Sequence, residues 1–231
     1  MKHVLLPDAG QHSLPFFLAM EEYVARKYDG EAFFVWRVDP TVIIGRNQVL
    51  ENEVNMDYCL RHGVEIVRRK SGGGCVYSDK GNIMISYISR RGDVEDVFGR
   101  YLSSLTDALR SLGLPAEKSG RNDVLVLGRK VSGNAFHMLP DRSIVHGTLL
   151  YSTDLEALTE AIQPPVEKLQ RHGVESVRQR VVNISELVEA MDKPHEALRS
   201  VDALEKYLVD YFTDDRIVLG EDDVMNIINM I

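Results

Sequence analysis

The residues best suited to chemistry lie in one run, RRKSGGGCVY at positions 68–77. Three successive basic side chains can meet an anion, and the glycines after Ser71 let a ligand or another backbone approach closely. Apolar stretches at 64–67 and 83–88 flank the run. Two interpretations are open from this run alone: a loop that wraps an anionic ligand, or a flexible hairpin beside a solvated basic patch.

Three further positions combine a chemically capable side chain with small neighbours. Trp36, the only tryptophan, lies in a strand-like run and suits either the core or a pocket wall. Lys130 precedes Ser132-Gly133, and a glycine inside a strand often marks a close approach by a ligand. His146 is followed by Gly147-Thr148, although a lone histidine on a strand is usually structural. We therefore treat Lys130 and His146 as candidates that need support from other residues.

The composition is that of an ordinary globular protein and excludes several classes of function. The chain has 231 residues, 44% hydrophobic and 27% charged, which suits one large domain or a domain with a small appendage. The net charge of −8 argues against general nucleic-acid binding. No apolar run is long enough for a bilayer, and residues 1–8 lack a secretory h-region. The two cysteines form no disulfide framework, so we expect a cytoplasmic protein without a membrane partner.

Hydrophobic periodicity predicts an α+β domain, because helices and strands do not alternate regularly along the chain. The expected helices cover residues 13–28, 52–61, 94–112, 154–162, 195–212 and 222–231, with a short one that begins at Asn183 or Ser185. The expected strands cover residues 32–38, 41–45, 64–69, 82–89, 123–127, 130–138 and 144–151. We expect a hairpin between 32–38 and 41–45, and pairing of 64–69 with 82–89. Residues 166–180, after Pro164-Pro165, are charged and expected to be irregular.

Five motifs taken together resemble a known family. They are WRVDPTVIIGRNQ at 36–48, RRKSGGGCVYSDKGN at 68–82, GRND at 120–123, GRKVSGNAF at 128–136 and HGTLL at 146–150. Their order is similar to that in lipoate–protein ligase A, of the biotin/lipoate ligase and octanoyltransferase superfamily, and VRQRVVNISEL at 177–187 resembles the end of its large domain. The joint pattern is far more specific than any one motif. It implies a class II synthetase/biotin-ligase-like domain, with a mixed, mainly antiparallel sheet core flanked by helices.

The resemblance implies a ligase reaction in two steps. ATP, with Mg²⁺ bound to its phosphates, would activate lipoate to lipoyl-AMP. A lysine of an acceptor lipoyl domain would then take the lipoyl group. The implied acceptors are the E2 subunits of 2-oxoacid dehydrogenases and the glycine-cleavage H protein. No dedicated metal ligands are expected, because Mg²⁺ in such sites is held largely by substrate phosphates and water.

The resemblance also assigns roles to individual residues. Lys130 would stabilise the negative charge that both steps develop, and is the implied catalytic residue. The residues implied to bind lipoate are Trp36, Arg69, Ser71, Gly72, Gly73, Gly74 and His146, with Arg69 at the carboxyl end. The residues implied to bind the nucleotide are Asn82, Asp123, Lys130, Ser132, Gly133 and Ala135.

Two departures from the family pattern leave alternatives open. Cys75 stands where the family usually has alanine, which raises the alternative of an octanoyl or lipoyl transferase with a cysteine nucleophile. Many members carry a further C-terminal domain, whereas here only residues 188–231 follow the last motif. We therefore expect a single catalytic domain over 1–231 with a helical extension at 190–231, acting alone or with a separate accessory protein. A non-catalytic lipoate binder is a third alternative, and the preference for lipoate or octanoate stays open.

Overall fold

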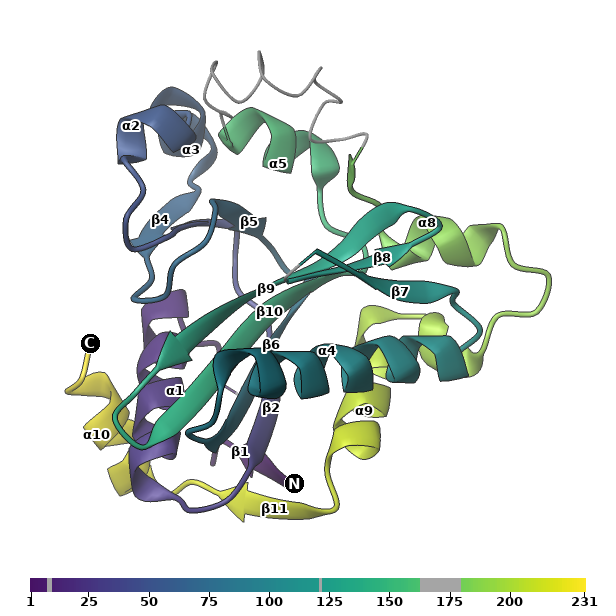
Figure 1. The fold of residues 1–231 in the computed structure, drawn as a ribbon. Coiled ribbons are helices and arrows are strands. Elements are labelled where there is room, and N and C mark those ends of the chain that lie inside the picture. The colour runs from purple at the N-terminus through teal and green to yellow at the C-terminus, as the bar shows by residue number, and fades with distance from the viewer. Residues whose placement is uncertain (8–9, 121, 163–179) are drawn as a thin grey trace.

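The computed structural model describes residues 1–7, 10–120, 122–162 and 180–231, and has two sheets (Figure 1). The strands of the larger sheet, in spatial order, are β11 (Asp215–Val218), β1 (Lys2–Leu5), β2 (Ala32–Trp36), β6 (Asn82–Arg90), β10 (Arg142–Leu150), β9 (Arg129–Met138), β8 (Asp123–Val126) and β7 (Ala116–Ser119). The smaller sheet contains β4 (Glu65–Arg68), β3 (Thr41–Ile44) and β5 (Val76–Ser78). From β2 to β7 every pairing in the larger sheet is antiparallel, while β1 pairs in parallel with β2 and β11.

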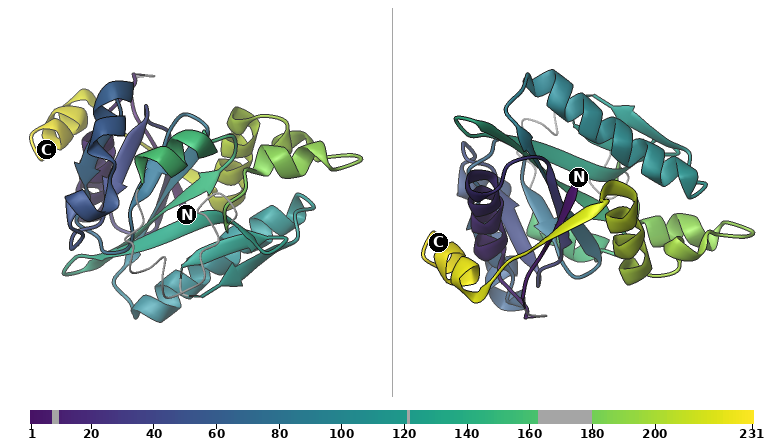
Figure 2. Two further views of the ribbon diagram at one scale, coloured as in Figure 1. Left: turned by 90° about the horizontal axis from the view of Figure 1, so that it is seen from above. Right: turned by 90° about the horizontal axis from the view of Figure 1, so that it is seen from below.

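Helices cover both faces of the larger sheet, as the two views of Figure 2 show. On one face lie α1 (Leu14–Lys27) and α10 (Glu221–Ile228). On the other lie α4 (Val94–Ser111), α8 (Ile184–Glu189), the 3₁₀ helix η1 (Glu196–Leu198) and α9 (Val201–Phe212). The smaller sheet packs with α2 (Leu50–Glu53), α3 (Met56–His62) and α5 (Leu155–Ala161) around a third apolar cluster. The predicted α+β class with a mainly antiparallel sheet is therefore confirmed.

The pairing of β10 with its neighbours decides which side chains face α1. His146 lies opposite Ser86 on β6 and Ala135 on β9. Paired residues share a face, and alternate residues along a strand point to opposite faces. Ile144 packs in the cluster with α1, whereas Val145 packs in the cluster with α4. His146, Ser86 and Ala135 therefore all project toward α1.

Local sequence signals account for several helix ends. The side chain of Asn55 accepts a hydrogen bond from Tyr58 N and begins α3, and Gly63 ends that helix with φ +64°. Asp154 caps α5 through Glu156 N and Ala157 N, as the sequence predicts. Asn183 begins α8, which decides between the two starts that the sequence left open. The prediction for 52–61 was wrong at its start, because α2 and α3 are separate helices.

Two predicted strand pairings were wrong. Residues 32–36 and 41–44 do not form a hairpin, because β2 pairs with β1 and β6 while β3 pairs with β4 and β5. Similarly, β4 does not pair with β6, whose two edges are occupied by β2 and β10. In both cases the edge that local sequence order suggested is filled by a strand from elsewhere in the chain.

The C-terminal part differs from the predicted helical extension. Strand β11 lies between α9 and α10 and pairs with β1, and neither of these strands was predicted. Strand β7 was also missed, and the expected helix 195–212 is divided into η1 and α9. Tyr211, predicted on the buried face, is 43% exposed. The predictions for Pro164-Pro165 and for residues 166–179 lie outside the described residues.

Helix α10 is attached to α1 through one buried carboxylate. Asp223, 7% exposed, forms an ion pair with Lys27 and accepts hydrogen bonds from Tyr23 Oη and Gly220 N. Burial alone would raise the pKa of Asp223, but the hydrogen bonds from Lys27 and Tyr23 lower it to about 2. The ionised carboxylate therefore stabilises the contact between these helices.

We expect Asp223→Asn to lower the free energy of unfolding at pH 7 by about 1–3 kcal/mol, the range for hydrogen bonds to a charged group. The difference in free energy of unfolding between wild type and Asp223→Asn should have its full size above the ordinary pKa of 3.8. It should disappear as the pH falls through about 2, because protonation removes the charge of Asp223. Urea unfolding between pH 2 and 7 measures this difference. Asp222→Asn, at an exposed neighbour, is the control, and an equal loss there would contradict the prediction.

Candidate active site

The glycine run forms the loop between β4 and β5, and Arg69 fixes its shape from inside. Arg69 is 5% exposed, and its Nε donates to Ser71 Oγ at 3.0 Å. Its Nη1 donates to Ile43 O at 3.1 Å, and its Nη2 donates to Gly72 O at 2.8 Å and Gly74 O at 2.7 Å. The sequence placed Arg69 at the carboxyl end of the ligand. In the structure its guanidinium binds loop carbonyls and Ser71, and Arg69 also lies in the wall of the cavity described below.

Two glycines are required by the geometry of this loop. Gly73 has φ +99°, a conformation that side chains rarely permit. A Cβ on Gly45, at the end of β3, would lie 2.2 Å from Gly73 O. Gly72 and Gly74 have open space where a Cβ would be. The loop therefore lies directly against β3 at Gly45 and leaves room beside its other glycines.

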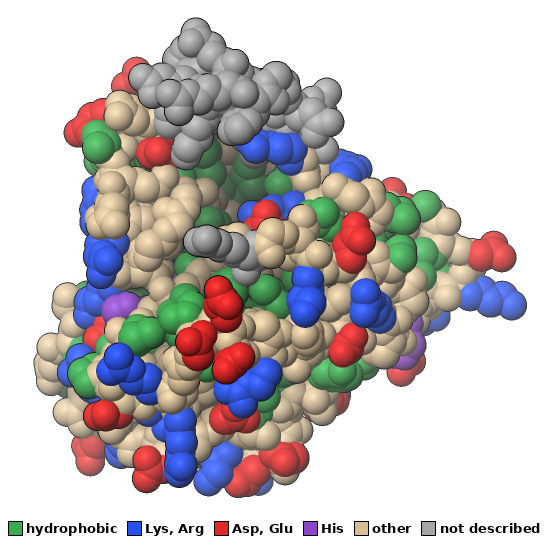
Figure 3. Space-filling view, viewed as in Figure 1, with side chains coloured by type: hydrophobic (Ala, Val, Ile, Leu, Met, Phe, Trp, Pro, Cys, Tyr) green, Lys and Arg blue, Asp and Glu red, His purple; other side chains and the backbone are tan. Residues whose placement is uncertain are grey.

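A cavity of about 110 Å³ lies between this loop, α1 and the larger sheet; we call it the lysine cavity. Predicted site residues in its wall are Trp36, Arg69, Gly73, Gly74, Lys130, Gly133, Ala135 and His146. Residues in its wall that the sequence did not single out for the site include Leu14, Leu18, Ile43, Met84, Asn122 and Thr148. One part of the wall is thus apolar, while Lys130 brings a cation to the cavity. In the space-filling view the molecular face is hollowed between α2–α3 and β8–β9 (Figure 3).

Lys130 lies at the cavity because Asp123 pairs with it and because Gly133 has no side chain to occupy its place. Its Nζ lies 2.8 Å from Asp123 Oδ1, and the two side chains are 34% and 31% exposed. A Cβ on Gly133 would lie 2.6 Å from Lys130 Nζ, so the lysine side chain lies across that glycine. Asp123 and Gly133 are directly paired between β8 and β9. The arrangement presents a partly exposed cation at the wall of the cavity.

Three predicted nucleotide residues, Asn82, Asp123 and Ser132, lie outside the wall of the lysine cavity. Ser132 is fully buried, and its hydroxyl accepts a hydrogen bond from Asn134 Nδ2 at 3.1 Å. Asn82 is also fully buried, and its Oδ1 accepts from Leu149 N at 3.1 Å. Asn82 Nδ2 and Ser78 Oγ have no partner among the described residues. Such unpaired buried groups are uncommon in proteins.

Buried polar side chains join the loop to α1 and the sheet. Glu21, 2% exposed, accepts from Ser86 Oγ at 2.6 Å and from His146 Nδ1 at 2.9 Å. A carboxylate only accepts, so His146 Nδ1 carries the hydrogen, and Ser71 Oγ can donate to Nε2 at 2.7 Å. Trp36 Nε1 donates to Ser86 Oγ at 2.9 Å and completes the set, which we call the Glu21 network. The sequence named Trp36, Ser71 and His146 but missed Glu21, because a glutamate inside a helix usually faces solvent.

Cys75 lies in the wall of the lysine cavity as a protonated thiol. Burial, with a smaller contribution from the charge of Glu53, raises the pKa of Cys75 to about 12. Thiols that act as nucleophiles have a lowered pKa. The structure thus removes the main motive for a cysteine-based transferase.

We expect alkylation of Cys75 by iodoacetamide to be slow at pH 7.5, because the thiolate fraction falls as the pKa rises above its usual 8–9. The rate should increase steadily up to about pH 11 without a plateau near pH 9, since the pKa is about 12. Mass spectrometry of the peptide that contains Cys75 measures the rate, with glutathione as the reference thiol. Rapid labelling at neutral pH would contradict the raised pKa.

Among the described residues, no group of three or more His, Cys, Asp or Glu side chains is placed to hold a metal ion. No helix in the described ranges has the length and apolar character needed to cross a bilayer.

The fold is an α+β domain with a cavity between a glycine loop and a mainly antiparallel sheet, and comparison with known proteins identifies its family. The lipoyl protein ligase A/B catalytic domain matches residues 14–213, and the chain belongs to this family. Lipoate-protein ligase LplJ of Bacillus subtilis (strain 168) is 40% identical over 175 residues. That alignment covers 74% of this chain and 53% of LplJ, so the chain spans about half the length of this curated relative.

Solved structures support the same fold over the whole chain. A bi-partite lipoate protein ligase from Thermoplasma acidophilum, analysed with its E2 lipoyl domain, superposes with a TM-score of 0.81 at 27% identity. The match covers 100% of this chain and 92% of that one. A lipoate-protein ligase A bound with ATP gives a TM-score of 0.81 at 25% identity, over 99% of this chain and 93% of that chain.

Proposed function

We propose that this protein is a lipoate–protein ligase that forms lipoyl-AMP from lipoate and ATP and transfers the lipoyl group to a lysine of an acceptor protein. The observation that carries the proposal is the position of Lys130, which lies across Gly133 in the wall of a cavity that also has an apolar part. The apolar wall suits an acyl chain, and the cation suits the end of that chain where charge develops. The family and the 40% identity to LplJ support the same activity.

In the first step, a lipoate carboxylate oxygen attacks the α-phosphorus of ATP and pyrophosphate leaves. Lys130 would move from Asp123 to the α-phosphoryl oxygens, where negative charge increases in the transition state. A cation placed against the α-phosphoryl oxygens stabilises such charge in the transition state. Asp123 would hold the lysine in place between turnovers.

In the second step, the amine of the acceptor lysine attacks the acyl carbon of lipoyl-AMP. The C–N bond forms, the bond to the phosphate oxygen breaks, AMP leaves with that electron pair, and the amine releases one proton to solvent. Negative charge now develops on the acyl oxygen, within reach of the same Lys130. One lysine can therefore serve both steps, because the two reacting centres share the phosphate oxygen that joins them.

The nucleotide would use groups that lack partners within the described protein. We assign Asn82 to the nucleotide, because its Nδ2 has no partner among the described residues. Mg²⁺ would enter on the ATP phosphates and neutralise part of their charge. Ser132 would act indirectly, because its hydroxyl is bonded to Asn134.

The acceptors in this proposal are lipoyl domains of 2-oxoacid dehydrogenase E2 subunits and the H protein of glycine cleavage, in the cytoplasm. A relative of similar length from Thermoplasma acidophilum is described as bi-partite and was analysed with an E2 lipoyl domain. Residues 1–231 would act as a single catalytic domain, and a separate accessory protein would be needed only if the isolated chain fails to form the adenylate.

Lipoate-dependent ATP–pyrophosphate exchange by the isolated chain is the decisive test. Incorporation of labelled pyrophosphate into ATP, with lipoate and Mg²⁺ present, supports a self-sufficient ligase. Lack of exchange, combined with transfer from synthetic lipoyl-AMP to an E2 lipoyl domain, would assign the chain to transfer alone. Failure of both reactions would exclude the proposed activity.

A further inference from the structure

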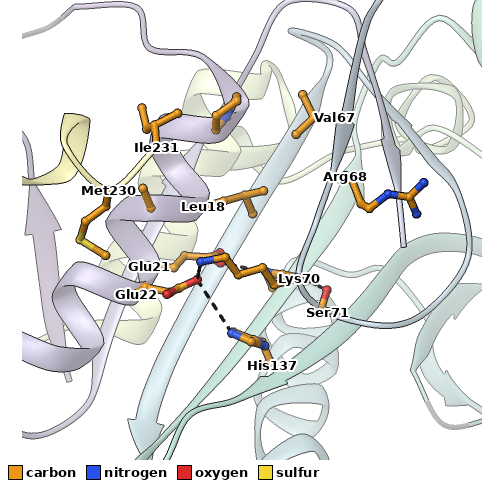
Figure 4. Close-up of a pocket in the computed structure, with 13 residues that line it drawn as sticks. Leu18, Glu21, Glu22, Val67, Arg68, Lys70, Ser71, His137, Met230 and Ile231 are labelled. Atoms are coloured by element: carbon orange, nitrogen blue, oxygen red, sulfur yellow. Dashed lines mark hydrogen bonds and ion pairs between the residues drawn. The ribbon is translucent and has the colours of Figure 1, made fainter. Parts of the chain in front are cut away.

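A second cavity, of about 150 Å³, lies beside the lysine cavity; we call it the rear cavity (Figure 4). Leu18 and His146 line both cavities, so these two side chains form the wall between them. Apolar residues in the rear cavity are Pro15, Leu18, Ala19, Val67, Met230 and Ile231. The space behind the wall can therefore accept methylene groups.

The rear cavity also has a charged side, where an ion pair joins the glycine loop to α1. Lys70 extends from the glycine loop to Glu22 on α1, with Nζ 2.5 Å from Oε1 (Figure 4). The Glu22 side chain is 7% exposed, whereas that of Lys70 is 69% exposed. His137 lies on the other side of the same carboxylate, 4.0 Å away. This ion pair limits the rear cavity toward solvent and sets a polar end to the space available for a chain.

The two residues of the wall differ in how firmly they are held. His146 is fixed by hydrogen bonds to Glu21 and Ser71, so a change there disturbs the Glu21 network. Leu18 is held by packing alone and is only half-buried. Leu14, one helical turn earlier, lines the lysine cavity but not the rear cavity. Leu18 is thus the part of the wall whose size can change without breaking a polar contact.

We propose that Leu18 sets the length of acyl chain that the site accepts, because it closes the lysine cavity toward the rear cavity. This inference rests on the proposed function for its acyl substrate. The carboxylate end of the chain meets Lys130, and the tail runs over the apolar wall until it reaches Leu18. A longer saturated chain clashes with Leu18 in the wild type, although apolar space lies directly behind it.

Leu18→Ala and Leu14→Ala together test this proposal, since both remove the same atoms from one face of α1, at a half-buried and at a fully buried position. Octanoate and decanoate serve as probes, in pyrophosphate exchange and in equilibrium binding by calorimetry. In Leu18→Ala the preference for decanoate over octanoate should increase about tenfold, the size expected when further methylenes are buried. In Leu14→Ala both affinities should fall while their ratio stays within about twofold, because no path to the rear cavity opens.

An unchanged ratio in Leu18→Ala, or an equal increase in Leu14→Ala, would overturn the proposal. Should Leu18→Ala fail to fold, Leu18→Phe thickens the wall and must shift the preference in the opposite direction, from octanoate toward hexanoate. The calorimetric binding measurements test the role of Leu18 separately from the proposed ligase activity. If the wild type binds these acids without exchange, the ligase activity fails while the role of Leu18 is still decided by the binding ratios.

Discussion

Lys130→Ala is expected to lower lipoate-dependent ATP–pyrophosphate exchange by about a hundred- to a thousand-fold, the usual cost of removing one group that stabilises transition-state charge. The loss has two physical sources. The variant lacks the cation that meets the α-phosphoryl oxygens, and it leaves Asp123 without the ion pair seen at 2.8 Å. An unpaired carboxylate beside the phosphates would repel them further. The exchange rate at saturating lipoate and ATP measures the combined effect.

The stability of the Lys130 variant should change little, because its ion pair is partly exposed and such pairs contribute at most about 1 kcal/mol. Lys118→Ala is a matched control, since it removes an exposed lysine from β7 of the same sheet. The double variant Lys130→Ala, Asp123→Asn separates the two sources. If the double variant exchanges pyrophosphate faster than Lys130→Ala, the unpaired Asp123 carboxylate contributes to the loss through repulsion. Normal exchange by Lys130→Ala would show that another group supplies the charge.

Glu21→Ala is expected to lower the free energy of unfolding by about 3 kcal/mol, because it leaves buried donors of Ser86 and His146 without an acceptor. For a chain of this size the midpoint of thermal unfolding should fall by roughly 6–12 °C. The KM for lipoate should also increase, because His146 and Ser71 lose their fixed positions beside the glycine loop. Calorimetry and the exchange assay measure the two effects on one preparation.

A double substitution tests whether the effect comes from the unpaired groups. Glu21→Leu with His146→Phe replaces two polar partners by apolar side chains, and such paired replacements can be nearly neutral for stability. We expect this variant to recover part of the stability relative to Glu21→Ala, because only the Ser86 hydroxyl remains without its acceptor. The KM for lipoate should stay high, because Ser71 has now lost His146 as its partner. Glu160→Ala, at an exposed position on α5, is the control for a simple loss of negative charge. If Glu21→Ala is as stable as that control, the network contributes nothing.

Segments with strong local signals were predictable from the sequence. The amphipathic stripe over 94–112 became α4, and the runs at 123–127, 130–138 and 144–151 became β8, β9 and β10 in the predicted antiparallel arrangement. Their partners are close in sequence and their turns are short. In contrast, β1 and β11 are four-residue strands that pair across most of the chain, and such a pairing leaves no periodic pattern to read.

Part of the candidate site was also predictable. The motifs with Trp36, the glycine loop, Lys130-Val131-Ser132-Gly133 and His146 pointed to one binding region, and most of these residues do line one cavity. Residue type alone did not reveal what each side chain contacts. Arg69 was expected to face an anion but donates to loop oxygens, and Glu21 was not expected at all.

The sequence by itself determined the family, the fold class and the residues able to carry charge, because these depend on composition and on motifs that are local. The tertiary structure alone decided which partners those residues meet. The ion pair of Lys130 with Asp123 depends on the pairing of β9 with β8, and the link of Glu21 to His146 depends on how α1 lies across β10. The wall formed by Leu18 likewise exists only between two cavities that distant segments enclose. Contacts between such segments are set by packing, for which a single sequence carries no local signal.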